Sequence, residues 1–363
     1  MNGATTQGFY DSDVVIEFDD HKDLLQYMPA YWREYFAQSD FEGPRANGVH
    51  GLPRTAISKF KSRLYQGGLA GYVSAFNSGY ATRFRPDGVV FNPLYNIESI
   101  RHPDLSAVLA TAVNDWMHDH LLTASGHSLF SIVVSPHYPD AAAAEIRRVA
   151  ARGRAAQVIL PACTAIPLGN RINRPIFEAA AEFGLPVALQ ATGYNGNPPT
   201  SSGWYTYFVE EFAGLKLTLE SQLMSLITEG VLAEFEQLKV VLLDSGVTWL
   251  PSYAWRFDKE WRGMRRDVPW VTKPPSEYIR EQVFCTVTGV DLPESVDEFR
   301  ACFDELDLSK SLLFASRYPY CHSPDTVESL IPSFVDQVFG TAALVENTRQ
   351  LYWKYHSRSV RGS

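Results

Sequence analysis

Several hallmarks of common function classes are missing from this chain of 363 residues. It has four cysteines and no C-x-x-C pair, which argues against a structural zinc site or a disulfide framework and favours a reducing compartment. No run approaches the roughly 18 apolar residues that a membrane span requires. The opening MNGATTQGFYDSD has neither a basic nor an apolar segment, so no signal peptide is predicted. We therefore expect a cytoplasmic protein without a membrane partner.

Positive charge is also scarce. The 32 Lys and Arg residues are outnumbered by 41 Asp and Glu, and no basic stripe is visible, which argues against nucleic acid as a partner. The chain has no G-x-G-x-x-G loop, no phosphate loop, no G-x-S-x-G elbow and no convincing Cys/His dyad. Aromatic residues, by contrast, are abundant, with 18 Tyr, 21 Phe and 8 Trp. They exceed ordinary core needs and suggest an interface or a lined pocket.

Short apolar runs alternate with helical patterns along most of the chain. The runs are nearly continuous, which is typical of parallel strands covered on both faces. They begin with DVVIEF near residue 13 and continue at 88–95, 131–136, 156–162, 186–192, 238–246, 283–289 and 311–319. Eight such β–α units predict an α/β fold, a (β/α)8 TIM barrel, with its active site at the carboxyl ends of the strands. The alternative, an open doubly wound sheet, requires the missing glycine-rich loop.

Two segments interrupt the alternation, although we predict that residues 1–363 form one barrel domain. Residues 30–80 are rich in Gly, Pro and aromatics and are interpreted as an excursion after the first strand, either a lid or a contact surface. Residues 193–207, GYNGNPPTSSGWYTY, suit a loop folded over the barrel mouth. For the Pro/Ser portion of this segment, a solvent-exposed connection is an equally good interpretation. For Trp204 and Tyr205 the loop over the barrel mouth is the better one.

Several segments resemble the amidohydrolase-2 family, which includes the aminocarboxymuconate-semialdehyde decarboxylase-like barrels. They include NDWMHDH, GLPVALQATG, the block from Ser225 to Arg280 and LLFASRYP, so the resemblance extends from about residue 10 to 355. It implies an amidohydrolase-type TIM barrel with one or two divalent metals at its mouth. The usual ligands are an Asp/His-x-His pair on the first strand, a His on the fifth and an Asp on the eighth, with assistance from the sixth. Such ligands bind a dication and leave a position open for substrate or water.

The first-strand ligands are incomplete in this chain. The resemblance places Asp11 and Asp13 of DSDVV in acidic positions, and Val15 where the family has a histidine. A looser alignment would use His21 instead, further along the chain.

The later ligand positions have changed as well. Gln190 replaces the histidine of the fifth strand, Asp244 keeps an acid on the sixth, and Arg317 replaces the aspartate of the eighth, in FASRYP. A guanidinium cannot ligate a metal and repels a nearby dication. We therefore predict that an Arg–carboxylate cluster occupies the place of the metal, and that this chain has no metal cofactor of its own.

Other residues are weaker candidates. His137 follows the third strand, and Cys321 and His322 follow Arg317, so the two histidines are predicted to line a pocket together with Gln190, Trp204 and Tyr205. The H-x-H pair His118 and His120 falls in a polar helical end, where the two rings point apart, so we interpret it as surface helix. The adjacent Glu210 and Glu211 cannot face one site from a helix.

Three functions follow from these residues. The first is a subunit of a heteromeric enzyme, supporting a homologous amidohydrolase-fold chain that carries Zn, Mn or Fe. In this respect the chain resembles the metal-poor partner of two-chain amidohydrolase-fold oxygenases, of the type that hydroxylates 2-aminoisobutyric acid. The second is a metal-independent lyase or decarboxylase of a small carboxylate, using Arg317 and Asp244 as catalytic residues. The third is a metal-dependent hydrolase or decarboxylase with displaced ligands.

Overall fold

The computed structural model describes residues 9–18, 21–41, 43–44, 68–121, 128–193, 197–288, 295–304, 306–319 and 340–353. Within these ranges eight strands form one sheet in chain order, and every neighbouring pair is parallel. The strands are β1 (Tyr10–Glu17), β2 (Gly88–Leu94), β3 (Ser128–Val133), β4 (Ala155–Pro161), β5 (Val187–Gln190), β6 (Val240–Leu243), β7 (Val283–Thr286) and β8 (Leu312–Leu313). Their side chains are almost all buried, as the continuous apolar runs predicted.

The sheet closes on itself between β1 and the segment that follows β8. The amide of Ser12 donates to Phe314 O at 3.0 Å, and the amide of Val15 donates to Tyr318 O at 2.8 Å. The predicted TIM barrel is therefore confirmed. The eighth strand is shorter than predicted, because its regular pairing with β7 ends at Leu313.

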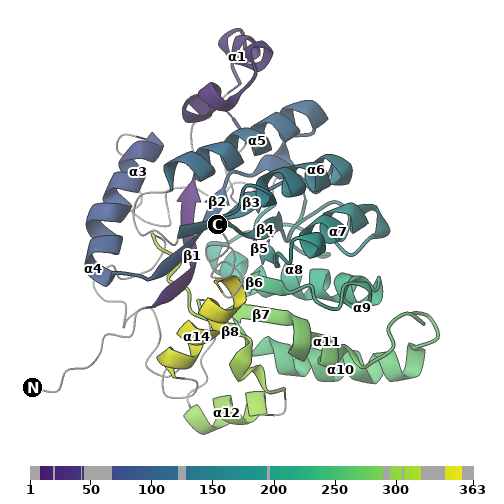
Figure 1. The fold of residues 1–363 in the computed structure, drawn as a ribbon. Helices are drawn as coiled ribbons and strands as arrows, with labels where there is room; N and C mark the ends of the chain where they lie inside the picture. The colour runs from purple at the N-terminus through teal and green to yellow at the C-terminus, as the bar shows by residue number, and fades with distance from the viewer. Residues whose placement is uncertain are drawn as a thin grey trace, which may run out of the picture.

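Helices surround the strands, as Figure 1 shows. Four of the helices around the strands have proline in their first turn, a position where its missing N–H costs nothing. The helices are α1 (Ala30–Ala37), α3 (Gly68–Phe76), α4 (Thr82–Phe84), α5 (Pro103–His120), α6 (Pro139–Ala150), α7 (Arg174–Glu182), α8 (Phe208–Thr228), α9 (Val231–Glu234), α10 (Trp249–Met264), α11 (Pro275–Gln282), α12 (Val296–Asp304) and α14 (Thr341–Tyr352). Short turns are η1 (His21–Tyr27), the π-helical η3 (Asn77–Ala81), η4 (Ile97–Ser99), η5 (Arg171–Asn173) and η6 (Leu308–Lys310).

The first predicted excursion is helical at both of its described ends. It begins with α1 and ends with α3 and η3, while residues 45–67 lie outside the described part of the chain. Tyr72 and Tyr80 are buried, and the Tyr72 hydroxyl donates to Val15 O at 2.7 Å. The end of the excursion is thus packed against β1.

The second excursion is described from residue 197 onward and leads into α8. Trp204 is 43% exposed and Tyr207 is 66% exposed. Tyr205 is half-buried, and its ring lies against Gly214 of α8, where an added Cβ would come within 1.9 Å of the Tyr205 hydroxyl. The aromatic side chains of this loop are therefore divided between solvent and the surface of α8.

The amino-terminal end of the barrel is closed by α14 and the residue after it. The Tyr352 hydroxyl donates to Gln157 Oε1 inside the barrel at 2.7 Å. The Trp353 ring lies 4.8 Å from that of Tyr10, at the start of β1, and covers Gly88, at the start of β2. No helix in the described ranges is long and apolar enough to cross a membrane.

A substitution at Gly88 tests whether Trp353 packs against the start of β2. A Cβ at Gly88 would lie 2.6 Å from the Trp353 ring, so we expect Gly88→Ala to lower the free energy of unfolding by about 1–3 kcal/mol through overpacking. Chemical denaturation followed by fluorescence measures this change. Gly79→Ala is the matched control, because nothing lies within 4 Å of a Cβ there. Unchanged stability in Gly88→Ala would contradict the described packing.

Candidate functional site

An ion pair lies at the carboxyl ends of β6 and β8. Arg317 Nη1 is 2.8 Å from Asp244 Oδ2, and the two side chains are 27% and 14% exposed. The structure thus brings together the arginine and one of the carboxylates that the sequence predicted to replace a metal. Since the pair is largely withdrawn from solvent, its attraction is screened less than that of a surface salt bridge.

Both partners adopt an unusual backbone conformation. Asp244 has φ 54° and Arg317 has φ 53°, in the left-handed region that residues with a Cβ rarely occupy. Each such residue costs on the order of 1–3 kcal/mol, and such residues concentrate at functional sites. Asp244 is supported from β7, since its amide donates to Thr286 Oγ1 at 2.9 Å. The positions of the two side chains are therefore held by the backbone as well as by each other.

Asp13 is the third member of the site. It is fully buried, and its Oδ1 accepts a 2.6 Å hydrogen bond from Asn92 Nδ2. Its Oδ2 has no hydrogen-bond partner in the described part of the chain. Burial raises the pKa of Asp13 to about 6, although the Arg317 guanidinium and the Asn92 hydrogen bond act to lower it. Near neutral pH, Asp13 can therefore hold or release a proton.

A chain of hydrogen bonds inside the barrel orients Asn92. Ser131 Oγ donates to Asn92 Oδ1 at 2.5 Å, and Gln157 Nε2 donates to the same oxygen at 3.1 Å. Gln157 is in turn held by Tyr352 at the bottom of the barrel. Because Asn92 Oδ1 is saturated as an acceptor, its amide nitrogen must face Asp13. The free oxygen of Asp13 is then Oδ2.

Asp11 has a different role from Asp13. It is also buried, but it accepts hydrogen bonds from the Tyr80 hydroxyl, from Ser316 N at 3.0 Å and from Asp13 N at 3.1 Å. Burial raises the pKa of Asp11, and the Ser316 and Tyr80 hydrogen bonds oppose that shift. These contacts tie β1 to the segment after β8, so Asp11 organises the site without opening onto it.

The remaining family ligand positions offer little to a cation. Val15 is buried and apolar. Gln190 is buried at the end of β5, where its backbone oxygen accepts from Ala162 N and Thr192 N, both at 2.7 Å. His21, the displaced alternative, lies on η1 with its ring stacked 4.9 Å from that of Phe36.

This donor set does not suit a divalent metal. A guanidinium occupies Asp244 Oδ2 at 2.8 Å, and Arg317 cannot act as a ligand. Across the described ranges, no three His, Cys, Asp or Glu side chains are grouped as a metal site would require. The residues present instead form a site for an anionic group, with one cation and an adjacent acid.

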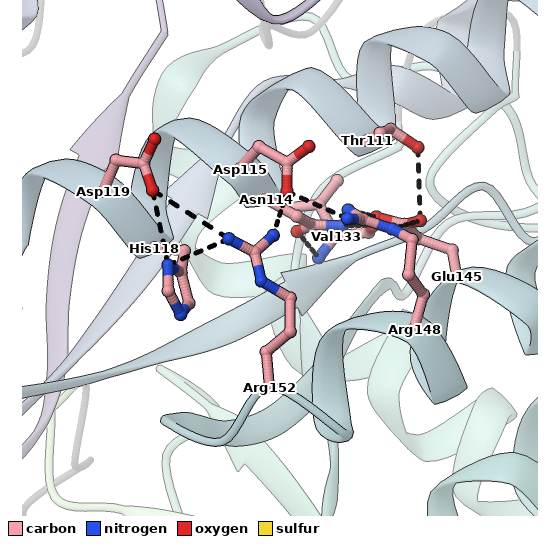
Figure 2. Close-up of polar contacts among 9 residues, drawn as sticks. All are labelled: Thr111, Asn114, Asp115, His118, Asp119, Val133, Glu145, Arg148 and Arg152. Carbon is pink, nitrogen blue, oxygen red and sulfur yellow. Dashed lines mark hydrogen bonds and ion pairs between the residues drawn. The ribbon is translucent and has the colours of Figure 1, made fainter.

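His118 and His120 lie at the end of α5, outside the barrel wall. Figure 2 shows His118 beside Arg152 and Asp119; its Nδ1 is 3.0 Å from Arg152 Nη2 and 3.4 Å from Asp119 Oδ1. The His120 ring stacks 4.7 Å from that of Trp116. The two histidines thus have different partners, in keeping with the predicted surface helix.

The same cluster joins α5 to α6. Arg148 Nε donates to Glu145 Oε2 at 2.7 Å, and Arg148 Nη1 donates to Asp115 Oδ1 at 3.0 Å (Figure 2). Asn114 Nδ2 donates to Glu145 Oε1 at 2.8 Å, and Asn114 Oδ1 accepts from Val133 N at 2.9 Å. All these groups are paired with one another, so the network is structural.

Other predicted residues have local partners. His137 Nε2 lies 2.9 Å from Glu98 O, and burial together with the charge of Arg101 lowers its pKa. Glu210 Oε2 accepts from the amides of Thr206 and Tyr207 at the start of α8, and so acts as a helix cap. Cys321, His322 and the Glu211 side chain lie outside the described residues.

Two residues of the barrel mouth and interior were missed by the sequence analysis. Asn92 interrupts the apolar run of β2, and a polar residue inside a buried strand is a signal that could have been used. Glu98 follows β2 at the catalytic end and is 6% exposed. Burial raises the pKa of Glu98 to about 7.

Comparison with known families and structures agrees with this architecture. The amidohydrolase family model matches residues 70–353, which is most of the chain. The chain belongs to the amidohydrolase family. No curated protein matches it.

Solved structures with the same fold are distant in sequence. A 5-carboxyvanillate decarboxylase from Novosphingobium aromaticivorans, with bound manganese and a nitrobenzoic acid, has a TM-score of 0.67 at 16% identity, covering 96% of this chain and 98% of that one. An amidohydrolase from Mycobacterium avium subsp. paratuberculosis has a TM-score of 0.65 at 15% sequence identity. The match covers 96% of this chain and 100% of that one. A dihydroxybenzoic acid decarboxylase from Polaromonas, with bound manganese, has a TM-score of 0.64 at 13% sequence identity. The match covers 95% of this chain and 96% of that one. At these identities the likeness establishes the fold alone.

Glu98 gives a pH-dependent prediction. Its folded pKa, about 7, lies above its ordinary 4.5, so the folded state holds a proton that the unfolded state releases. Its contribution to stability is therefore complete below pH 4.5 and falls by up to about 3 kcal/mol as pH rises to 7. We expect Glu98→Gln to remove this fall, measured as the free energy of unfolding from pH 4.5 to 8. The exposed Glu236→Gln is the control, and parallel profiles for wild type and Glu98→Gln would refute the assignment.

Proposed function

We propose that this chain is a metal-independent lyase of the decarboxylase type, acting on a small carboxylate-bearing substrate. The observation that carries the proposal is the 2.8 Å pair between Arg317 and Asp244 at the mouth of the barrel. A guanidinium can hold a carboxylate through two parallel hydrogen bonds, and Asp244 keeps it in place. Arg317 then takes the position from which the family's metals bind substrate.

The chemistry needs one proton. In a decarboxylation the bond between carbon and the carboxylate breaks, its electron pair passes to the carbon, the carbon takes a proton and carbon dioxide leaves. Asp13 suits the donor role, because Asn92 occupies Oδ1 and leaves Oδ2 as the oxygen that carries the proton. Solvent then restores the proton. The sequence hypothesis assigned acid–base work to Asp244, and here its main role is to hold Arg317.

Known structures support the reaction class. Decarboxylases of 5-carboxyvanillate and of 2,6-dihydroxybenzoate share this fold. Manganese is bound in the first of these proteins, whereas the donor set of this chain does not suit a dication. We infer that a fixed positive side chain replaces the metal as the electrostatic anchor of the substrate carboxylate.

Arg317→Met is the decisive variant. We expect wild-type activity on a panel of hydroxybenzoates, followed as carbon dioxide release, to survive a chelator. We expect Arg317→Met to lower kcat/KM by about 100-fold or more, since a charge-assisted anchor is lost. Arg349→Met, which removes a surface pair with Glu346 on α14, is the control. Activity that disappears with chelator and returns with manganese would refute the proposal.

A second candidate is the subunit of a heteromeric enzyme. It is favoured by large apolar side chains left exposed on and after α10, where Trp255, Met264 and Trp270 are 45%, 57% and 40% exposed. Such a surface suits a protein partner. In this proposal a homologous amidohydrolase-fold chain holds Zn, Mn or Fe and performs an oxygenase, hydroxylase or hydrolase reaction on a small carboxylate or amino acid.

The composition of the native complex separates the two candidates. We expect purification through a tag on this chain to recover a second amidohydrolase-fold chain that carries the metal, with Trp255→Arg reducing its recovery. Metal per polypeptide is then measured for each separated chain. Recovery of this chain alone, active on a carboxylate, would exclude the subunit role.

A further inference from the structure

Two buried polar side chains at the mouth each have one oxygen without a hydrogen-bond partner among the described residues. Glu98, on η4 after β2, and Ser135, after β3, are each 6% exposed. Glu98 Oε1 and Ser135 Oγ make no hydrogen bond with any described residue. Buried polar groups are nearly always paired in folded proteins. Their position at the catalytic end of neighbouring strands points to a ligand as the missing partner.

Residues from two neighbouring loops lie near Glu98. His137, after β3, lies 2.9 Å from Glu98 O through Nε2, and its Nδ1 is 3.5 Å from Arg101 Nη1. Cys163, after β4, is near enough for the charge of Glu98 to contribute to its raised pKa, after the larger effect of burial. The Cys163 thiol faces Asn197 O and Pro198 O, at 3.7 and 3.6 Å. Glu98, after β2, therefore has residues of the loops after β3 and β4 beside it, and Cys163 in turn contacts the loop after β5.

The surroundings of Glu98 are rich in hydrogen-bond acceptors and poor in positive charge. An ionised carboxylate only accepts hydrogen bonds, and the nearby backbone oxygens of residues 197 and 198 are acceptors too. Arg101 is directed at His137, and no cation in the described ranges contributes to the pKa of Glu98. A group that supplies both donors and positive charge would satisfy this site, and a protonated amine supplies both.

We propose that Glu98 and Ser135 form a second polar subsite of the mouth, which binds the protonated amine of a small amino carboxylate. The assignment of the ligand's carboxylate to Arg317 rests on the proposed function. The assignment of its amine to Glu98 and Ser135 does not depend on that function. An empty subsite keeps Glu98 largely protonated. When the ammonium group binds, the Glu98 O–H bond breaks, the carboxylate pairs with the ammonium and one proton passes to solvent.

Calorimetry in two buffers of different ionisation enthalpy tests the proposal at pH 6. The probes are butylammonium, butanoate and the ω-amino carboxylates from 3-aminopropanoate to 6-aminohexanoate. We expect butylammonium and at least one amino carboxylate to release protons on binding. Glu98→Gln should weaken the amine probes by at least tenfold and leave butanoate unchanged. Ser135→Ala is a second variant that preserves the charge of Glu98, and it should weaken the amines less.

The outcomes distinguish the two assignments. Binding of butylammonium with proton release, lost in Glu98→Gln, supports the subsite even if butanoate does not bind; the latter result would count against Arg317 as the carboxylate anchor. Equal affinity for amino carboxylates and their unaminated counterparts, or amine binding that is unaltered in Glu98→Gln, would overturn the subsite. Loss of butanoate binding in Arg317→Met, with amine binding retained, supports both assignments.

Discussion

The site depends on the closure of the barrel between β1 and the segment after β8. Backbone hydrogen bonds from Ser12 and Val15 to that segment, and the bond from Ser316 N to Asp11, fix the two pieces of chain to each other. Asp13 and Arg317 lie within these two pieces. Without this closure, a buried acid and a half-buried guanidinium would have no fixed relation, and each would carry its cost of desolvation alone.

In this amidohydrolase-family barrel, an arginine and a carboxylate form an ion pair at the carboxyl ends of the strands. Asp244 directly follows β6, and its partner is the Arg317 guanidinium at 2.8 Å. Both residues adopt a left-handed backbone despite its cost, and such strained residues concentrate at functional sites. A permanent side-chain charge cannot dissociate, as a metal can, and it offers a planar pair of donors in place of open coordination positions.

The polar interior extends from the bottom of the barrel to its mouth. Tyr352 holds Gln157, Gln157 and Ser131 hold Asn92, and Asn92 holds one oxygen of Asp13. Such networks are costly when incomplete and rigid when satisfied. Among the described residues, Asp13 Oδ2 at the mouth and Glu98 Oε1, on η4 after β2, have no hydrogen-bond partner. Both free oxygens are at the end of the barrel where substrates bind in this fold.

The sequence by itself predicted the eight strands, because they follow from local apolar runs, and the resemblance to the family led us to expect Val15, Gln190 and Arg317 at ligand positions. It also indicated that Arg317 would meet a carboxylate, without determining which one. Only the tertiary structure decided that Asp244 is the partner, that Asp11 is fully used in closing the barrel and that Asp13 keeps a free oxygen. Burial and hydrogen-bond partners come from segments far apart in the chain, as the pairing of Ser316 with Asp11 illustrates, and no local pattern encodes them.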